Sequence, residues 1–208
     1  MPVQVLLYVV AALAAYLLGS IPTGYLVARM HPNVDLLRQG SKKTGATNVL
    51  RTLGWRAAAI VFGGDFAKGV AAVLIARLLA GGDPVADVLA GVAAILGHNY
   101  SLFIGFRGGR GVTAGLGSLA VMAPVAMLAV AVVAVSVIGI SRYVSLGSVI
   151  GACVTPIAVL VMVLAFSQPL PHLLFAVAGS ALVVASHRDN IGRLLNGTER
   201  RLGERVQG

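Results

Sequence analysis

The chain has 208 residues, of which 58% are hydrophobic and 11% charged, against roughly 25% charged in soluble domains. A mean hydropathy of +0.91 excludes an ordinary soluble domain and predicts one polytopic membrane domain over residues 1–208, with a basic tail from about residue 188. The net charge of +9 is concentrated between apolar runs without accompanying aromatic residues, so we expect membrane lipid as a partner, no nucleic acid and no obligate protein partner.

Long apolar runs predict helices that can each cross a hydrocarbon core of about 30 Å. They lie at 3–28, 55–80, 85–104, 113–141, 144–166 and 171–187. The first run carries no basic residue before Arg29, which favours a retained helix over a signal peptide. As one helix, the run at 113–141 would reach roughly 43 Å. Pro124 interrupts it, so we expect two short helices that meet near Ala123-Pro124.

Basic residues indicate the orientation of these helices. They cluster in the connection 29–56, at Arg107 and Arg110, and in the tail at Arg188, Arg193, Arg200, Arg201 and Arg205. Because cytoplasmic loops are enriched in Lys and Arg, this pattern predicts an all-α membrane bundle with seven transmembrane helices, N-terminus outside and C-terminus inside. Five helices, with 113–141 re-entrant, is the alternative.

Three polar clusters on the cytoplasmic side predict a binding site for a phosphorylated molecule. They read Gly40-Ser-Lys-Lys-Thr-Gly-Ala-Thr-Asn48 with Arg51, Phe106-Arg-Gly-Gly-Arg-Gly-Val112, and His187-Arg-Asp-Asn-Ile-Gly-Arg193. Glycines allow close backbone approach, and hydroxyls, amides and guanidiniums bind phosphate. A helix that starts near Gly45 would direct its N-terminal N–H groups toward an anion.

Other polar residues lie within or beside the apolar runs. Asp65 and Lys68 are three residues apart, as a structural ion pair or the lining of a polar cavity requires. His98 is more typical of a hydrogen-bonded structural residue than of a base. Ser148 lies on one helix face with Ser145 and either faces the site or bonds to the preceding turn. The four histidines and Cys153 are scattered, so we expect no metal and no cofactor.

Taken together, these segments resemble the PlsY family of membrane acyl-phosphate:glycerol-3-phosphate acyltransferases. The matching elements, in family order over about residues 15–200, are Gly19-Ser-Ile-Pro-Thr-Gly24, Gly40-Ser with Gly45-Ala-Thr-Asn48 and Arg51, Asp65-Phe-Ala-Lys-Gly69, Gly97-His98, Phe106-Arg-Gly-Gly-Arg-Gly-Val112, Tyr143-Val-Ser with Ser148, His187-Arg-Asp-Asn190, and Arg193-Leu-Leu with Gly197-Thr-Glu199. Two departures stand out. Lys42-Lys43 replaces the usual Gly-Asn, and Arg110 stands where the family often has Lys.

The resemblance implies transfer of a fatty acyl group from acyl-phosphate to the 1-hydroxyl of sn-glycerol 3-phosphate, an early step of phospholipid synthesis, in a bacterial plasma membrane with the active site toward the cytoplasm. The products would be 1-acylglycerol 3-phosphate (lysophosphatidic acid) and phosphate. The implied catalytic residues are Ser41, Lys68, Arg110 and His187. The implied substrate-binding residues are Gly45, Thr47, Asn48, Arg51, His98, Gly108, Gly109, Ser148 and Asn190.

The sequence also bears on the mechanism and on other functions. An H-x4-D acyltransferase pair is missing, since only three residues separate His31 from Asp35, and no G-x-S-x-G motif is present. Direct transfer without an acyl-enzyme is therefore the expectation. A transporter of a small organic phosphate would share the basic cavity, but no paired broken helices or repeat symmetry is evident. A CDP-alcohol phosphotransferase would need several metal-binding Asp residues, and only Asp65 lies well inside a predicted span.

Overall fold

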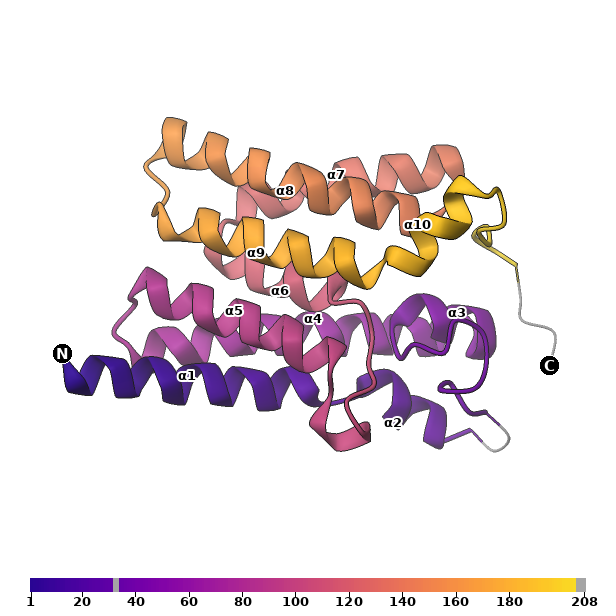
Figure 1. Cartoon of the computed structure of the whole chain (residues 1–208), viewed down its shortest axis with the longest axis horizontal. Helices are drawn as coiled ribbons and strands as arrows, with labels where there is room; N and C mark the ends of the chain where they lie inside the picture. Colours follow the sequence, from indigo (N-terminus) through magenta and orange to yellow (C-terminus); the bar gives the residue numbers. More distant parts are fainter. Residues whose placement is uncertain (32–33, 205–208) are drawn as a thin grey trace.

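The computed structural model describes residues 1–31 and 34–204, and within these ranges it contains helices and one isolated bridge, between Ser101 and Arg107, but no strand (Figure 1). Arg205, part of the expected tail, and residues 32–33, within the spacing from His31 to Asp35, lie outside the described residues. The helices are α1 (Pro2–Ser20), α2 (Thr23–Arg29), α3 (Ala46–Leu53), α4 (Trp55–Leu79), α5 (Pro84–Asn99), α6 (Val112–Met122), α7 (Pro124–Ser141), α8 (Val144–Phe166), α9 (Pro171–Ser186) and α10 (Arg188–Leu195), with a 3-10 turn at Leu102–Ile104.

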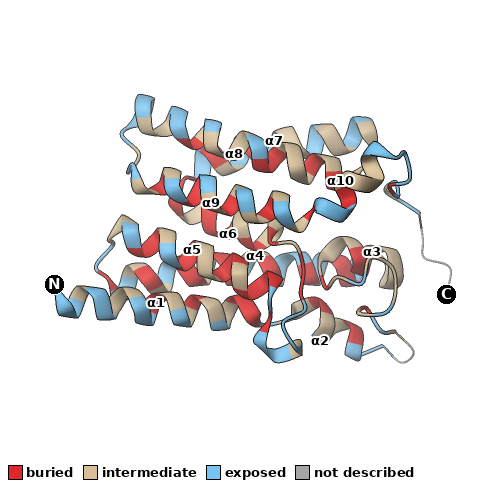
Figure 2. Ribbon diagram, viewed as in Figure 1, coloured by how far each residue is buried: buried red, intermediate tan, exposed pale blue. Residues whose placement is uncertain are grey.

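The surface of this bundle is suited to lipid. Four helical segments of the described chain are long and apolar enough to cross a membrane: residues 2–29, α4, α7 and α8. Helices α5, α6 and α9 are shorter but also apolar. Exposed residues lie along the outer helices, whereas buried ones lie where helices face each other (Figure 2). Many of the exposed side chains are large and apolar, such as Leu13 and Leu164, so the chain forms an all-helical, membrane-embedded bundle.

The predicted helix boundaries hold in one place and fail in two others. The division of 113–141 is confirmed, because α6 ends at Met122 and α7 begins at Pro124. The expected helix over 3–28 is wrong as a continuous element, since it breaks at Ile21-Pro22, where proline disfavours a helical conformation for the preceding residue. The helix expected over 85–104 ends at Asn99, and the chain then folds back so that Ser101 pairs with Arg107.

Glycines bring the central helices into close contact. A Cβ atom added at Gly19 of α1 would lie 2.3 Å from the Ala94 carbonyl oxygen of α5. Between α4 and α6, a Cβ at Gly117 would lie 2.1 Å from the Phe66 carbonyl oxygen. Small residues at such positions let helix backbones approach one another, which is how membrane helices gain packing energy without a hydrophobic driving force.

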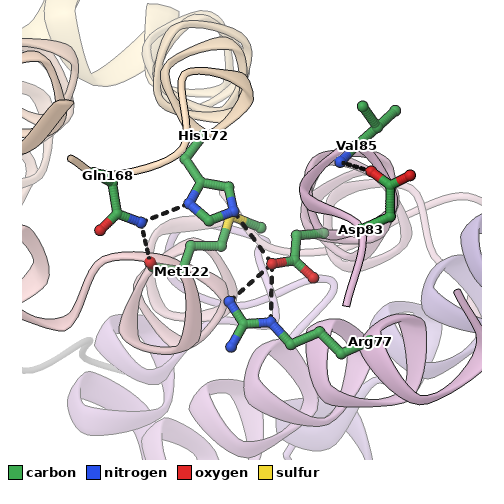
Figure 3. A network of polar contacts seen from close by, with 7 residues as sticks. Arg77, Asp83, Val85, Met122, Gln168 and His172 are labelled. Carbon is green, nitrogen blue, oxygen red and sulfur yellow. Dashed lines mark hydrogen bonds and ion pairs between the residues drawn. The ribbon is translucent and has the colours of Figure 1, made fainter. Parts of the chain in front are cut away.

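A polar network closes the end of the bundle that includes the N-terminus (Figure 3). Asp87, buried on α5, accepts hydrogen bonds from Arg77 at 2.9 Å from Nε and 2.8 Å from Nη2. Its Oδ2 atom also lies 3.2 Å from Nε2 of His172. Gln168 Nε2 completes the network, 2.7 Å from Nδ1 of His172 and 2.6 Å from the carbonyl oxygen of Met122. Because the Met122 carbonyl precedes the α6–α7 break, the network also satisfies a backbone group that the break leaves unpaired.

The close packing of α4 and α6 predicts that Gly117→Ala destabilises the protein. The added methyl group meets the backbone of Phe66, so we expect a loss of about 2 kcal/mol in the free energy of unfolding. Gly139→Ala on α7 is the matched control, because no atom lies within 4 Å of the new methyl group. Thermal unfolding in detergent measures both. Equal midpoints for the two variants would contradict this account of the α4–α6 contact.

Candidate active site

An open cavity of about 1190 Å³, including the space at its mouth, lies at the end of the bundle where α3 and α10 are found. Most residues expected to bind substrate line it: Ser41, Gly45, Thr47, Asn48, Arg51, His98, Gly109, Arg110, Ser148, His187 and Asn190. Lys68 and Gly108 do not. The lining also includes polar residues that were not expected to contact substrate, namely Lys43, Asp65, Thr113, Ser145 and Glu199.

Four helices begin at this cavity. Thr47 lies in the first turn of α3 and Thr113 in that of α6, while Ser145 follows the start of α8 and His187 immediately precedes α10. The free N–H groups and the positive end of the dipole are at the start of each helix. The cavity is therefore electropositive from its backbone as well as from its side chains, and it favours an anion.

Asn48 holds the loop that precedes α3 rather than a phosphate. Its Oδ1 atom accepts the N–H of Ser41 at 3.0 Å. Its Nδ2 atom donates to the carbonyl oxygens of Lys43 at 2.9 Å, Gln39 at 3.2 Å and Leu36 at 3.3 Å. Both ends of the buried amide are therefore bonded to the loop backbone, and the expected phosphate contact from Asn48 is replaced by a positioning role.

The intramembrane carboxylate Asp65 lies on the cavity wall and has two cationic or polar neighbours. Lys68 Nζ is 2.8 Å from Asp65 Oδ1 and donates to the Ile21 carbonyl oxygen at 2.9 Å. That carbonyl belongs to the break before Pro22, so Lys68 also satisfies a backbone group at the end of α1. His98 Nδ1 lies 3.5 Å from the same Asp65 oxygen. The ammonium of Lys68, expected at a substrate phosphate, is thus bound inside the protein.

The glycine-rich loop before α6 is pressed against the end of α5. A Cβ at Gly109 would lie 1.9 Å from His98 Nε2, and one at Gly108 would lie 2.1 Å from the His98 carbonyl oxygen. Glycine at positions 108 and 109 therefore lets the loop pack against the end of α5. Gly108 does not line the cavity and contributes only through this packing. The next residue, Arg110, faces the cavity, and its buried Nε has no hydrogen-bond partner among the described residues. Burial, followed by the charge of Arg193, lowers the pKa of Arg110 to about 10, so the side chain stays protonated at neutral pH.

Glu199 was not among the residues expected in the site, yet it organises one wall of the cavity. Its carboxylate accepts hydrogen bonds from Ser145 Oγ at 2.9 Å, Asn190 Nδ2 at 2.8 Å and Arg193 Nε at 2.7 Å. Burial would raise the pKa of Glu199, but these hydrogen bonds lower it below its ordinary value and keep the group ionised. The Oδ1 atom of Asn190 remains buried without a partner among the described residues. Asn190 therefore presents an unused acceptor.

His187 is a neutral acceptor at the cavity. Burial lowers its pKa to about 4, although its hydrogen bond to the Val183 carbonyl oxygen acts in the opposite direction. Its Nδ1 is 2.8 Å from that carbonyl, so Nδ1 carries the proton and donates it. Nε2 is left with a lone pair that can accept a hydrogen bond from a hydroxyl group.

Ser148 lies where two cavities meet. Its Oγ donates a hydrogen bond to the Val144 carbonyl oxygen at 2.9 Å. This bond to the preceding turn is the one expected from the sequence as the alternative to a side chain that faces the site. A second cavity of about 490 Å³, with a largely apolar lining, extends from here between α6, α8 and α9. Both cavities share the lining residues Val112, Leu116, Ala134 and Ser148. Among the described residues, no group of three His, Cys, Asp or Glu side chains is arranged to hold a metal ion.

The two departures from the resemblance differ in their structural effects. Lys42 is exposed and has φ of 55°, a left-handed conformation that glycine adopts without strain and lysine does not. Lys43 points its half-buried side chain to the cavity. Arg110 keeps a positive charge at the position where the family often has Lys. Lys42-Lys43 therefore adds backbone strain at Lys42 and a positive charge in the cavity at Lys43. Arg110 changes only the shape of a cationic group.

The fold and the cavity together define a membrane-embedded helical protein with a site at one end that favours an anion. Residues 9–197 match the family model described as glycerol-3-phosphate acyltransferase. The chain is 46% identical over 199 residues to glycerol-3-phosphate acyltransferase 2 of Moorella thermoacetica, covering 96% of this chain and 100% of the relative. It is 47% identical over 197 residues to the glycerol-3-phosphate acyltransferase of Thermus thermophilus, covering 94% and 95%. The chain belongs to the glycerol-3-phosphate acyltransferase (PlsY) family.

Two crystal structures have the same fold. They are of PlsY (YgiH), described as an integral membrane glycerol 3-phosphate acyltransferase, in a glycerol 3-phosphate form and a lysophosphatidic acid form. The first has a TM-score of 0.86 and 38% identity over 94% of this chain and 96% of that chain. The second has a TM-score of 0.84 and 37% identity over 95% and 96%.

Proposed function

We propose that the protein transfers a fatty acyl group from acyl-phosphate to the 1-hydroxyl of sn-glycerol 3-phosphate, giving 1-acylglycerol 3-phosphate and phosphate. The observation that carries this proposal is the two-sided chemistry of one cavity. Cations and helix N-termini line one side, and apolar residues of α7, among them Val135 and Ile138, line the other. The glycerol 3-phosphate and lysophosphatidic acid named for the similar crystal structures are the acceptor and the product of this reaction.

The acyl tail has an apolar place to lie. The wall formed by α7 and the adjoining cavity of about 490 Å³ bring apolar side chains next to the cationic side. A phosphate headgroup and a hydrocarbon tail of one donor molecule can therefore be held at the same time. Holding both reactants in position contributes several kcal/mol toward lowering the barrier.

The acceptor hydroxyl is assigned to the wall formed by α9, α10 and α8. Nε2 of His187 accepts the hydrogen bond of the 1-hydroxyl, and Asn190 Oδ1 accepts from the neighbouring hydroxyl of the glycerol. Glu199 acts through Ser145 and Asn190 by holding these side chains in place. Ser41, Thr47 and Arg51 bind one phosphate group at the start of α3, where the helix N–H groups are free.

The chemical step is a direct transfer between the two bound substrates. The hydroxyl oxygen attacks the acyl carbon, the bond from that carbon to the phosphate oxygen breaks, and phosphate leaves. The hydroxyl proton passes to an oxygen of the departing phosphate, because a histidine with a pKa of about 4 is a weak base. Arg110 stabilises the negative charge that develops on the carbonyl oxygen and the phosphate.

We also infer the orientation in the membrane: seven crossings formed by α1 and α4–α9, with the N-terminus outside and the cavity toward the cytoplasm of a bacterial plasma membrane. The basic connections, and the position of the N-terminus at the end of the bundle opposite α3 and α10, support this arrangement.

Labelling of single cysteines tests the orientation after Cys153, the one cysteine of the chain, is replaced by alanine. A cysteine at exposed Pro124 should react with an impermeant reagent from outside the cell, and one at exposed Arg200 should react only after the membrane is opened. Reaction of the Arg200 position from outside intact cells would rule out the seven-crossing arrangement.

The reaction is tested by phosphate release from palmitoyl-phosphate with purified protein. We expect release to depend on glycerol 3-phosphate and to match the 1-acylglycerol 3-phosphate formed, with little turnover of acyl-CoA. Comparable rates with acyl-CoA would refute the donor assignment. Uptake of glycerol 3-phosphate into proteoliposomes without phosphate release would instead favour a transporter.

Arg110 provides the sharpest test of the site. Arg110→Ala removes a charged hydrogen bond to a buried anion, about 2–4 kcal/mol, and should lower turnover roughly 30- to 1000-fold. Arg110→Lys should keep much of the activity, since it retains the charge. Arg107→Ala, an exposed cation in the same loop, is the control for effects on insertion and yield. Near-normal turnover per folded Arg110→Ala protein would remove Arg110 from the site.

A further inference from the structure

The buried and half-buried lysine and arginine side chains of this bundle divide into two groups. Lys68, Arg77 and Arg193 each have a carboxylate within 2.8 Å, and all three help hold helices or loops together. The second group, Lys43, Arg51 and Arg110, lines the cavity and makes no ion pair within 4.0 Å among the described residues. Cations that are partly desolvated without a carboxylate partner are stabilised by an anion from outside the chain.

Hydrogen bonds of the main chain hold the loop segment that contains Lys43 beside the cavity. Its carbonyl oxygen accepts a hydrogen bond from Asn48 at 2.9 Å, so the buried amide of α3 holds the residue from one side. The N–H of the following residue, Thr44, donates to the Gly108 carbonyl oxygen at 3.4 Å, and Thr44 is itself buried. These contacts link Lys43 to the loop that carries Arg110. The preceding residue, Lys42, has the same charge but is exposed and does not line the cavity.

The charges around Lys43 favour an anion beside it. Burial, followed by the nearby positive charge of Arg110, lowers the pKa of the Lys43 ammonium. Of the other charged groups that act on Lys43, the carboxylate of Asp189 opposes this effect and the guanidinium of Arg188 adds to it. A phosphate between Lys43 and Arg110 would replace the repulsion between two cations with two attractive contacts.

We propose that Lys43 is a phosphate-binding residue, which together with Arg110 holds the phosphate group of one of the two substrates. This assignment rests on the proposed function, because both substrates of that reaction carry a phosphate. The group recognised is a phosphate ester or acyl-phosphate anion. Since Lys43 contacts the phosphate and not the reacting carbonyl, it acts on substrate affinity rather than on the rate of the chemical step.

The test compares Lys43→Gln with Lys42→Gln in the purified full-length protein. Both variants lose one positive charge from adjacent positions, so they have the same net charge and differ in whether the lost side chain lines the cavity. We expect Lys43→Gln to raise the KM for either glycerol 3-phosphate or palmitoyl-phosphate about 5- to 20-fold, with kcat changed less than about 2-fold. Lys42→Gln should leave both KM values within about 2-fold. Lys43→Arg should restore most of the lost affinity because it restores the charge.

The substrate whose KM rises identifies which phosphate Lys43 binds. Equal KM values for Lys43→Gln and Lys42→Gln with both substrates would overturn the proposal. Calorimetric binding of glycerol 3-phosphate and of inorganic phosphate separates this outcome from a failure of the proposed reaction. Weaker binding of either probe to Lys43→Gln, but not to Lys42→Gln, would support the role of Lys43 even without turnover. If the wild-type protein binds neither probe, or if Lys43→Gln binds both as well as wild type does, the assignment is wrong.

Discussion

The absence of water in the bilayer interior is the constraint on which the rest of this structure depends. Polar groups at membrane depth have to find partners within the protein. Asp65 forms an ion pair with Lys68, and Asp87 forms one with Arg77. The Ile21 carbonyl oxygen, left free by the break before Pro22, accepts a hydrogen bond from the ammonium of Lys68. Against this background of paired groups, the cations left without carboxylates stand out. These cations, Lys43, Arg51 and Arg110, line the open cavity at one end of the bundle.

The site depends on where helices begin rather than on any one motif. Segments separated by up to about 140 residues in the sequence meet because α3, α6, α8 and α10 all start at one end of the bundle. The loop before α3 contains Gly40 and Gly45, and the loop before α6 contains Gly108, Gly109 and Gly111, so at these two helix starts the backbone can come close to an anion. The cavity that results has a cationic wall, with Lys43, Arg51 and Arg110, and an apolar wall formed by α7. This arrangement suits the two proposed substrates, each of which carries a phosphate group, while only the proposed donor carries a hydrocarbon tail.

Much of this could be predicted from the sequence where the relevant signal was local. Pro124 indicated the α6–α7 break, and the helix start considered near Gly45 agrees with α3, which begins at Ala46. Partners that come from distant segments were not predictable from spacing. Glu199 accepts a hydrogen bond from Ser145, 54 residues away. The partners of Asn48 are only 5 to 12 residues away, but they lie in a loop without regular structure, whose turns the spacing does not define. The break at Ile21-Pro22 had a local signal in Pro22, but the apolar run continued through it and concealed it.

The network at the other end of the bundle has a consequence for how the chain is made. Arg77 and Asp87 are synthesised early, whereas His172 lies 85 residues beyond Asp87. Until α9 inserts, the buried carboxylate lacks one of its partners, and the Met122 carbonyl at the α6–α7 break lacks Gln168. The same helix ends at His187, which lines the cavity. Placement of α9 therefore supplies missing partners at one end of the bundle and His187 at the other, and a nascent chain that stops before Gln168 lacks both.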